Sequence, residues 1–129
     1  MSPSKCDDMR FDNSDKDCGM PFGMALHHQT KMLYVCDAFF GFGVLGPEGG
    51  LVTILSTMAD GEPYRSCNTV DVHQPTGNVF FTDHMQVLQF KTAVSVNDST
   101  GRLLKYDAKN KQVTELFRNL SFGASAIIL

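Results

Sequence analysis

Residues 32–56 read MLYVCDAFFGFGVLGPEGGLVTILS, and three short apolar bursts in this stretch are separated by glycine, proline and polar residues. Each burst has the length of a β-strand, and the β-branched run LVTIL suits a half-buried strand. The sequence GPEGG supplies the residue types that tight turns require. The stretch therefore predicts three consecutive short strands joined by turns.

The same pattern occurs again further along the chain. The segment MALHHQTKMLYVCD (24–37) aligns with VDVHQPTGNVFFTD (70–83), so that histidine, threonine and aspartate fall at equal places in both copies. Each copy reads as a strand, a polar turn and a second strand that ends at an aspartate. A third and a fourth burst follow, FGVLGP and GLVTIL in the first copy, GRLLKYD and QVTELF in the second. The second copy also carries an insertion, HMQVLQFKTAVSVND, before its third strand.

A repeat of four short strands over roughly 40–50 residues is typical of the blades of a β-propeller, which stack radially. We therefore expect an all-β chain with an N-terminal arm at 1–19 and two four-stranded blades at 20–66 and 67–129. A single sandwich of eight strands would show the same alternation. It would not require its two halves to resemble each other.

Charge and hydropathy limit the partners of the chain. The formal net charge is -3 at pH 7 and no basic stripe is present, so we expect no nucleic-acid partner. The apolar runs are far shorter than the ~18 residues of a membrane-spanning helix, so we expect no membrane span. The N-terminus is polar and acidic without a secretory signal, which predicts a cytosolic protein or a natural N-terminus that lies upstream.

The four cysteines match no C-x-x-C pattern, and the histidines fit no zinc-finger spacing, so we expect no zinc site. Cys6 and Cys18 bracket a polar, aspartate-rich arm, where a disulfide would pin an otherwise loose segment. Cys36 and Cys67 have no evident partner, and we expect each to be a buried free thiol.

Asp37 and Asp83 end equivalent strands of the repeat. A residue that recurs at the same place in each blade is expected to accept hydrogen bonds from the backbone of the following turn, rather than to form a catalytic carboxylate pair. His27 and His28 begin a turn, so we expect both to be exposed to solvent.

Five sequence blocks resemble the strictosidine synthase and strictosidine synthase-like proteins of plants. They are CG-P-G-A (18–25), LYVCDAFFGFGVLGPEGG (33–50), DGEPY (60–64), VFFTD (79–83) and TGRLLKYDAKNKQVTEL (100–116). The resemblance implies a six-bladed propeller with a central pocket for a small-molecule substrate. A complete ring needs about 300 residues at roughly 50 per blade, so the chain is expected to be an N-terminal fragment of about two blades.

The resemblance also implies a chemistry. Strictosidine synthases condense tryptamine with the aldehyde secologanin, and a glutamate of a late blade acts as the acid–base group. That blade is absent here, so we assign no catalytic residue. Glu48, Glu62 and Glu115 are expected to be surface charges.

Two pocket positions survive in the block GEPYRSCNTV, where Ser66 and Asn68 stand in place of the aromatic residues that line the synthase pocket. The loss of that wall predicts poor binding of an indole ring. Asn68 resembles an asparagine ligand of the calcium-dependent lactonase branch, but calcium takes about six to eight oxygen ligands. The alternative role of Asn68 is that of a hydrogen-bonded residue of an inner strand. No other cofactor is expected.

Two sequons, at Asn97 and Asn119, are candidate glycosylation sites. By resemblance the chain is expected in the vacuole or the endoplasmic reticulum and secretory route. The favoured function is part of an enzyme of plant alkaloid-type metabolism that is inactive alone. The alternatives are a non-catalytic β-sheet interaction protein and part of a calcium-dependent lactonase-like hydrolase. Open propeller edges predict self-association.

Overall fold

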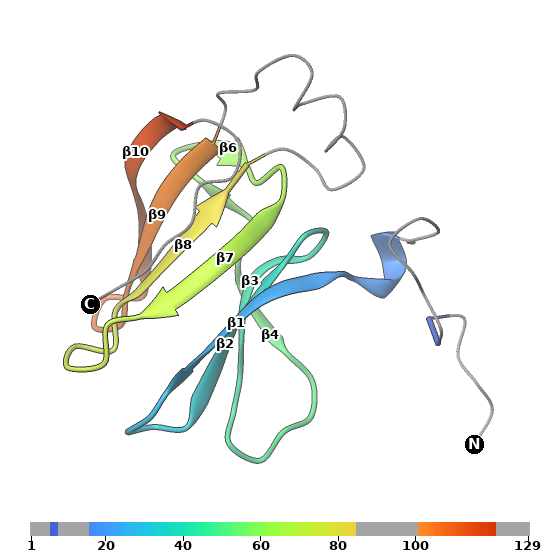
Figure 1. The fold of residues 1–129 in the computed structure, drawn as a ribbon, viewed down its shortest axis with the longest axis vertical. Coiled ribbons are helices and arrows are strands. Elements are labelled where there is room, and N and C mark those ends of the chain that lie inside the picture. Colours follow the sequence, from blue (N-terminus) through green and yellow to red (C-terminus); the bar gives the residue numbers. More distant parts are fainter. Residues whose placement is uncertain (1–5, 8–15, 85–100, 121–129) are drawn as a thin grey trace.

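The computed structural model describes residues 6–7, 16–84 and 101–120. Within them the chain consists of β-strands and turns, apart from one short 3-10 helix, η2 (Lys16–Cys18) (Figure 1). No helix in these residues is long and apolar enough to cross a membrane. The prediction of an all-β chain is confirmed.

Two antiparallel four-stranded sheets form the body of the molecule (Figure 1). The first sheet contains, in order, β1 (Pro21–His27), β2 (Met32–Asp37), β3 (Gly41–Leu45) and β4 (Thr53–Ser56). The second sheet contains β7 (Cys67–Val72), β8 (Val79–Asp83), β9 (Gly101–Asp107) and β10 (Gln112–Leu120), and β7 is the strand that lies against β1. These are the four strands per repeat that the sequence predicts, and the inserted segment of the second copy lies mostly outside the described residues.

A small hairpin of β5 (Met58–Ala59) and β6 (Glu62–Pro63) connects the two sheets. The sequence did not predict this hairpin, because strands of two residues each produce no alternation that a pattern can detect.

The core lies between the two sheets and is dominated by aromatic rings. Phe42 of the first sheet stacks on Phe81 of the second with a centroid separation of 4.2 Å, and Tyr34 and Tyr106 pack around the pair. Phe42 and Phe81 are fully buried. Aromatic contacts of this kind add to the apolar burial that holds the two sheets together.

A disulfide between Cys36 and Cys67 crosses the same interface and joins β2 to β7, with the Cα atoms 5.0 Å apart. The prediction of two free thiols is therefore wrong. Both cysteines are buried as expected, but only the packing of one sheet on the other reveals that they face each other. In the arm, Cys6 and Cys18 form the expected bridge with a Cα separation of 5.3 Å.

The first strands of the two sheets approach closely. A Cβ atom added to Gly23 of β1 would lie 2.4 Å from the carbonyl oxygen of Asn68 in β7. Only glycine, which has no side chain, fits at this position. The close approach is part of what positions β7 against β1.

The turns of the repeat have the same hydrogen bonds in both sheets. Lys31 N donates to His27 O, and Gly77 N donates to His73 O, at 2.8 Å in each case. Both acceptor histidines also contact a threonine hydroxyl three residues later, at 2.8 and 2.7 Å. His28 is exposed as predicted, whereas the prediction for His27 is wrong, because its ring is 7% exposed and lies against the second sheet.

Candidate functional site

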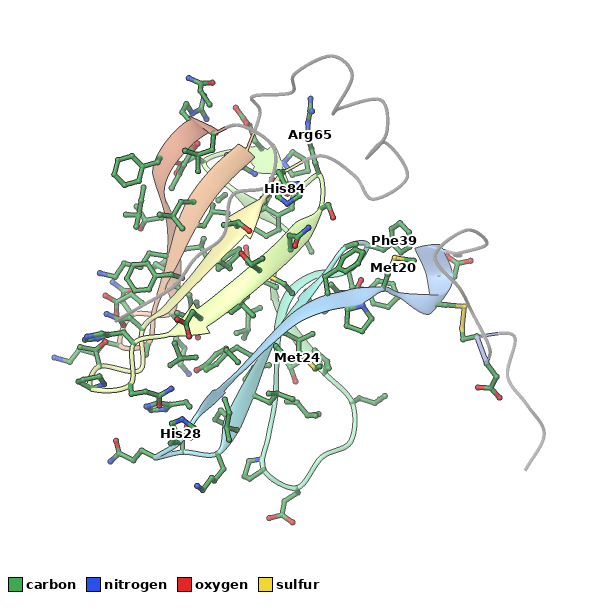
Figure 2. The ribbon with its side chains drawn as sticks, in the orientation of Figure 1. Met20, Met24, His28, Phe39, Arg65 and His84 are labelled. Atoms are coloured by element: carbon green, nitrogen blue, oxygen red, sulfur yellow. A yellow bond between two sulfur atoms is a disulfide. The ribbon has the colours of Figure 1, made fainter. Side chains whose placement is uncertain are left out.

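A polar cluster occupies the end of the second sheet where β8 finishes and β9 begins. The cluster borders a cleft of about 170 Å³ between the β5–β6 hairpin and β10, and the cleft is lined by Glu62, Pro63, Arg65, Asp83, Arg102, Arg118 and Asn119. Figure 2 shows Arg65 and His84 near this end of the sheet. We call it the polar cleft.

Arg102 is the central residue of the polar cleft and is 4% exposed. Its guanidinium donates to the carbonyl oxygens of Ala59 at 3.0 Å, Glu62 at 3.2 Å and Pro63 at 3.4 Å, and to Asp83 Oδ2 at 3.1 Å. It also lies 5.6 Å from the centre of the Tyr64 ring. The guanidinium therefore attaches the connecting hairpin to the second sheet and is largely occupied by protein acceptors.

Asp83 is the buried partner of Arg102. Its Oδ1 accepts a hydrogen bond from Ser66 N at 2.7 Å, and its Oδ2 accepts from Arg102. Burial raises the pKa of the Asp83 carboxyl, while the Ser66 amide and the Arg102 guanidinium oppose that shift. Both oxygens of this carboxyl thus have structural partners.

The two equivalent aspartates of the repeat differ in their contacts. Asp37 Oδ1 accepts from Phe39 N at 2.8 Å and Phe40 N at 2.9 Å, as predicted for the following turn. Each aspartate also accepts from the backbone N of the residue that precedes the first strand of its sheet, Met20 N to Asp37 Oδ2 at 2.8 Å and Ser66 N to Asp83 Oδ1 at 2.7 Å. The other oxygen differs, because Asp83 Oδ2 binds Arg102. The reason is the third strand, because Asp37 faces Gly41 and Asp83 faces Arg102 in the register.

The glutamates at the mouth of the cleft are paired with Arg118. Arg118 contacts Glu115 through Nε and Nη2 at 2.9 and 3.0 Å, and Glu62 through Nη2 at 3.3 Å. The Arg118 guanidinium lowers the pKa of Glu115, which therefore stays ionised at neutral pH. Glu62 and Arg118 are more than half exposed, and Glu48 is exposed in the loop between β3 and β4. The Glu115 side chain is only 8% exposed, so the prediction that it is a surface charge is wrong.

Ser66 and Asn68 lie at the start of the second sheet and not on the polar cleft. Ser66 is fully buried, and within the described residues its Oγ has no hydrogen-bond partner. Asn68 is half-buried in β7, beside Gly23. The role of both residues in lining a pocket stays a prediction.

Calcium binding at Asn68 stays a prediction. No group of three or more His, Cys, Asp or Glu side chains within the described part of the chain could hold a metal ion. One asparagine cannot supply the roughly six to eight oxygen ligands that calcium requires. Of the two sequon asparagines, Asn97 lies outside the described residues, and Asn119 is exposed at the polar cleft with φ 60°.

A second surface is the outer face of the first sheet, which points away from the second sheet. The register places Met24 opposite Val35, Leu26 opposite Leu33, and Gly43 opposite Ile54 on this face. Met24 is 64% exposed and the nearby Leu51 is 94% exposed. The face borders an apolar hollow of about 540 Å³ next to Phe40 and Val52.

The residues of this cluster that sequence reasoning missed are Arg102, Arg118 and Tyr64. Arg102 occurs in the block GRLLKYD, yet its importance depends on the β8–β9 register and on the hairpin it binds. A comparison of the two copies shows the difference, because the residue opposite the repeated aspartate is Gly41 in the first copy and Arg102 in the second.

Comparisons with known proteins identify similar sequences over most of the chain. The profile of the strictosidine synthase family matches residues 68–128. The protein STRICTOSIDINE SYNTHASE-LIKE 10 of Arabidopsis thaliana is 42% identical over 109 residues, which are 82% of this chain and 29% of that protein. Strictosidine synthase of Catharanthus roseus is 32% identical over 116 residues, covering 86% of this chain and 33% of the enzyme. The chain thus spans about a third or less of the length of these relatives.

A solved structure shows the same fold. A chain in the crystal structure of a nidogen/laminin complex, a protein of the β-propeller type, superimposes with a TM-score of 0.54 at 19% identity, covering 76% of this chain and 31% of that chain. The likeness supports the propeller arrangement of the two sheets and says nothing about activity.

Proposed function

Because this chain belongs to the strictosidine synthase-like family, we propose that it supplies two adjacent sheets of a β-propeller protein of plant alkaloid-type metabolism and does not catalyse a condensation by itself. The observation that carries the proposal is the 42% identity over 82% of the chain, set against 29% of the relative's length. The substrate of the larger assembly is a small molecule.

The chemistry of the polar cleft supports a structural role for its carboxylates. General acid–base catalysis needs a group that can exchange a proton with the reacting atoms. Asp83 is bound by Ser66 and Arg102, and Glu115 is held ionised by Arg118. These two carboxyls stabilise the fold, and the acid–base group belongs to another part of the complete protein.

The substrate of the complete protein is also expected to differ from that of a true synthase. Ser66 and Asn68 stand where the resemblance implies aromatic residues, and aromatic rings bind an indole by stacking and apolar burial. An indole amine would lack these partners. Part of a calcium-dependent lactonase-like hydrolase stays an alternative, in which Asn68 would supply one of the roughly six to eight oxygen ligands.

The condensation assay tests this proposal. The purified chain is incubated with tryptamine and secologanin, and the Catharanthus enzyme serves as the positive control. We expect no strictosidine above the uncatalysed background by mass spectrometry. Product formation that follows the concentration of this chain would overturn the proposal.

We also propose that the chain folds in an oxidising compartment such as the endoplasmic reticulum and secretory route. All four cysteines are in disulfides, and such bonds persist mainly in oxidising compartments. Asn119 is exposed and would be open to a glycosyltransferase. A cytosolic pool with fully reduced cysteines in plant cells would contradict this location.

A second candidate function is that of a non-catalytic interaction protein, which the outer face of the first sheet favours. Exposed apolar patches of several hundred Å² mark interaction surfaces on monomeric proteins. Met24, Leu26 and Ile54 are exposed apolar side chains on this face, and we propose that they drive self-association of the isolated chain.

A further inference from the structure

Asn119 and Arg118 line the same polar cleft, although they are neighbours in the strand β10. Successive side chains of a regular strand point to opposite faces of the sheet. In β10 the register shifts between Phe117 and Leu120, and Asn119 has a φ of 60°. An irregularity of this kind re-aims a side chain, so Asn119 lies beside Arg118 at one cleft.

Two properties of the sequence suit asparagine at this position. Asparagine adopts a positive φ more readily than most residues do. Asn119-Leu120-Ser121 is also a sequon for N-linked glycosylation. Because Asn119 is exposed, a sugar on its Nδ2 atom is compatible with the folded chain.

Arg118 has hydrogen-bond donors to spare at the mouth of the cleft. Its Nε and Nη2 atoms donate to Glu115 and Glu62 at distances of 2.9–3.3 Å. A guanidinium has five N–H donors, and within the described residues no acceptor binds the two on Nη1. The Arg118 side chain is 52% exposed, so a polar group from outside the fold can reach these donors.

Glu62 supplies acceptors on the opposite rim. The β5–β6 hairpin that carries it lies beside β10 (Figure 1). Glu62 Oε1 accepts from Arg118 at 3.3 Å, and Glu62 Oε2 lies 3.9 Å from Arg102 Nη1. A carboxylate has about four lone-pair sites, so Glu62 can accept a further hydrogen bond.

The chemistry of this rim complements an N-acetylhexosamine. The acetamido oxygen of such a sugar accepts hydrogen bonds, and each hydroxyl both donates and accepts. The sugar carries no charge, so it leaves the ion pairs of the cleft in place. The cleft measures about 170 Å³, which is less than the roughly 300–1,000 Å³ of pockets that enclose a small ligand. It therefore suits one sugar unit at its mouth.

We propose that Asn119 carries an N-linked glycan whose first N-acetylglucosamine lies over the polar cleft. Its acetamido oxygen accepts from Arg118 Nη1, and one of its hydroxyls donates to Glu62. The sugar thus links β10 to the β5–β6 hairpin. This inference rests on the proposed folding in the secretory route, because the glycan is added there.

The transfer that attaches the glycan uses a lipid-linked diphosphate sugar as its donor. The bond between the anomeric carbon of the sugar and the diphosphate oxygen breaks, and the diphosphate leaves with the electron pair. The bond between Asn119 Nδ2 and that carbon forms, and Nδ2 loses one proton.

The test compares the full chain with and without the sugar. The chain is secreted from a host that makes high-mannose glycans, with Ser99→Ala to remove the sequon at Asn97, and an endoglycosidase trims the glycan to one N-acetylglucosamine. Ser121→Ala gives the matched chain without the sugar and keeps Asn119. We expect one N-acetylhexosamine by intact mass, and a Tm about 2–6 °C above that of the Ser121→Ala protein, the range for one or two exposed hydrogen bonds.

The stabilisation should depend on Arg118. In an Arg118→Met background we expect the Tm difference between the chains with and without the sugar to fall to about half or less, because the cycle isolates the coupling of the two groups. Lys109→Met changes an exposed lysine in the turn between β9 and β10 and is the matched control. The Lys109→Met background should keep the full difference.

Enzymatic release of the untrimmed glycan by a peptide N-glycosidase provides a second readout. We expect slower release from the folded native chain than from folded Arg118→Met, and equal rates from the two denatured proteins. An Asn119 without a glycan in the secreted chain, or a Tm difference and a release rate that Arg118→Met leaves unchanged, would overturn the inference. The experiment imposes the secretory route and uses no condensation assay, so a failure here is distinguishable from a failure of the proposed function.

Discussion

Arg102 is buried against Asp83, and removing either partner would leave an uncompensated charge inside the protein. Replacing Arg102 by methionine keeps much of the side-chain volume but deletes every hydrogen bond to the connecting hairpin. We expect Arg102→Met to lower the free energy of unfolding by about 3–5 kcal/mol, the usual cost of breaking a buried ion pair. Urea denaturation followed by circular dichroism measures the change.

Arg118→Met is the matched control for this prediction. Arg118 is 52% exposed, so water screens its ion pairs more than that of Arg102, although the Glu115 side chain is only 8% exposed. We expect the loss of Arg118 to cost about 1–2 kcal/mol, less than the loss of Arg102. Equal destabilisation by the two substitutions would contradict the central role of Arg102.

The three tyrosines of the chain provide a pH test, because the chain contains no tryptophan. Burial raises the pKa of Tyr34, Tyr64 and Tyr106, and that of Tyr64 to about 12. A raised pKa in the folded state means that the neutral phenol contributes stability below pH ~10. For Tyr64 that stability is lost as the pH rises from ~10 to about 12.

We therefore expect little tyrosinate absorbance at 295 nm near pH 10 in the folded protein, followed by a steep rise that coincides with unfolding. The urea-unfolded protein should titrate near its ordinary pKa of ~10. A gradual titration of all three tyrosines near pH 10, with the circular dichroism unchanged, would refute the buried positions.

At the level of single residues, the sequence predicts where a residue lies in the repeat better than it predicts the hydrogen-bond partners of that residue. The repeat locates Asp37 and Asp83 at equal places, but the residue across the third strand decides what each aspartate binds. His27 is similar, because the pattern identifies a turn and does not show that Gln74 of the other sheet covers the ring. Contacts between the two sheets depend on how the sheets pack, and a local sequence pattern does not predict that packing.

Between elements, the side-chain amide of Gln74 joins the first turns of the two sheets, because it accepts from His28 N at 2.9 Å and donates to Leu26 O at 2.9 Å. Gln74→Ala removes the two bonds to Leu26 O and His28 N, and we expect a loss of about 1–3 kcal/mol in the free energy of unfolding. Gln74→Glu should also destabilise the protein near neutral pH, because a carboxylate cannot donate to Leu26 O. Gln29→Ala is the control, and thermal unfolding of the four proteins measures the differences.

The strands themselves were predictable because their signals are local. Apolar bursts of strand length, turn residues between them and the internal repeat indicated all eight strands of the two sheets. The β5–β6 hairpin was not predictable, since its strands are two residues long and are stabilised by Arg102 from another part of the chain.

For the whole molecule, the two disulfides should differ in their resistance to reduction. Cys36 and Cys67 are fully buried between the sheets, whereas Cys6 and Cys18 are partly exposed in the arm. A thiol must reach a sulfur atom to reduce the bond. We expect a mild phosphine reductant to open Cys6–Cys18 first and Cys36–Cys67 only in denaturant, as followed by alkylation and peptide mass mapping. Equal rates for both bonds would contradict the buried inter-sheet bridge.

The central claim is that the chain forms two adjacent propeller sheets and that the first sheet exposes apolar residues, Met24 and Ile54 among them, on its outer face. The claim is tested most directly by size-exclusion chromatography with light scattering at tens of micromolar. The exposed apolar residues of the first sheet predict a mass that rises with concentration above the 14.2 kDa of one chain, without a fixed stoichiometry. A sharp monomer peak at all concentrations, with cooperative thermal unfolding, would show instead that the two sheets form a self-sufficient domain.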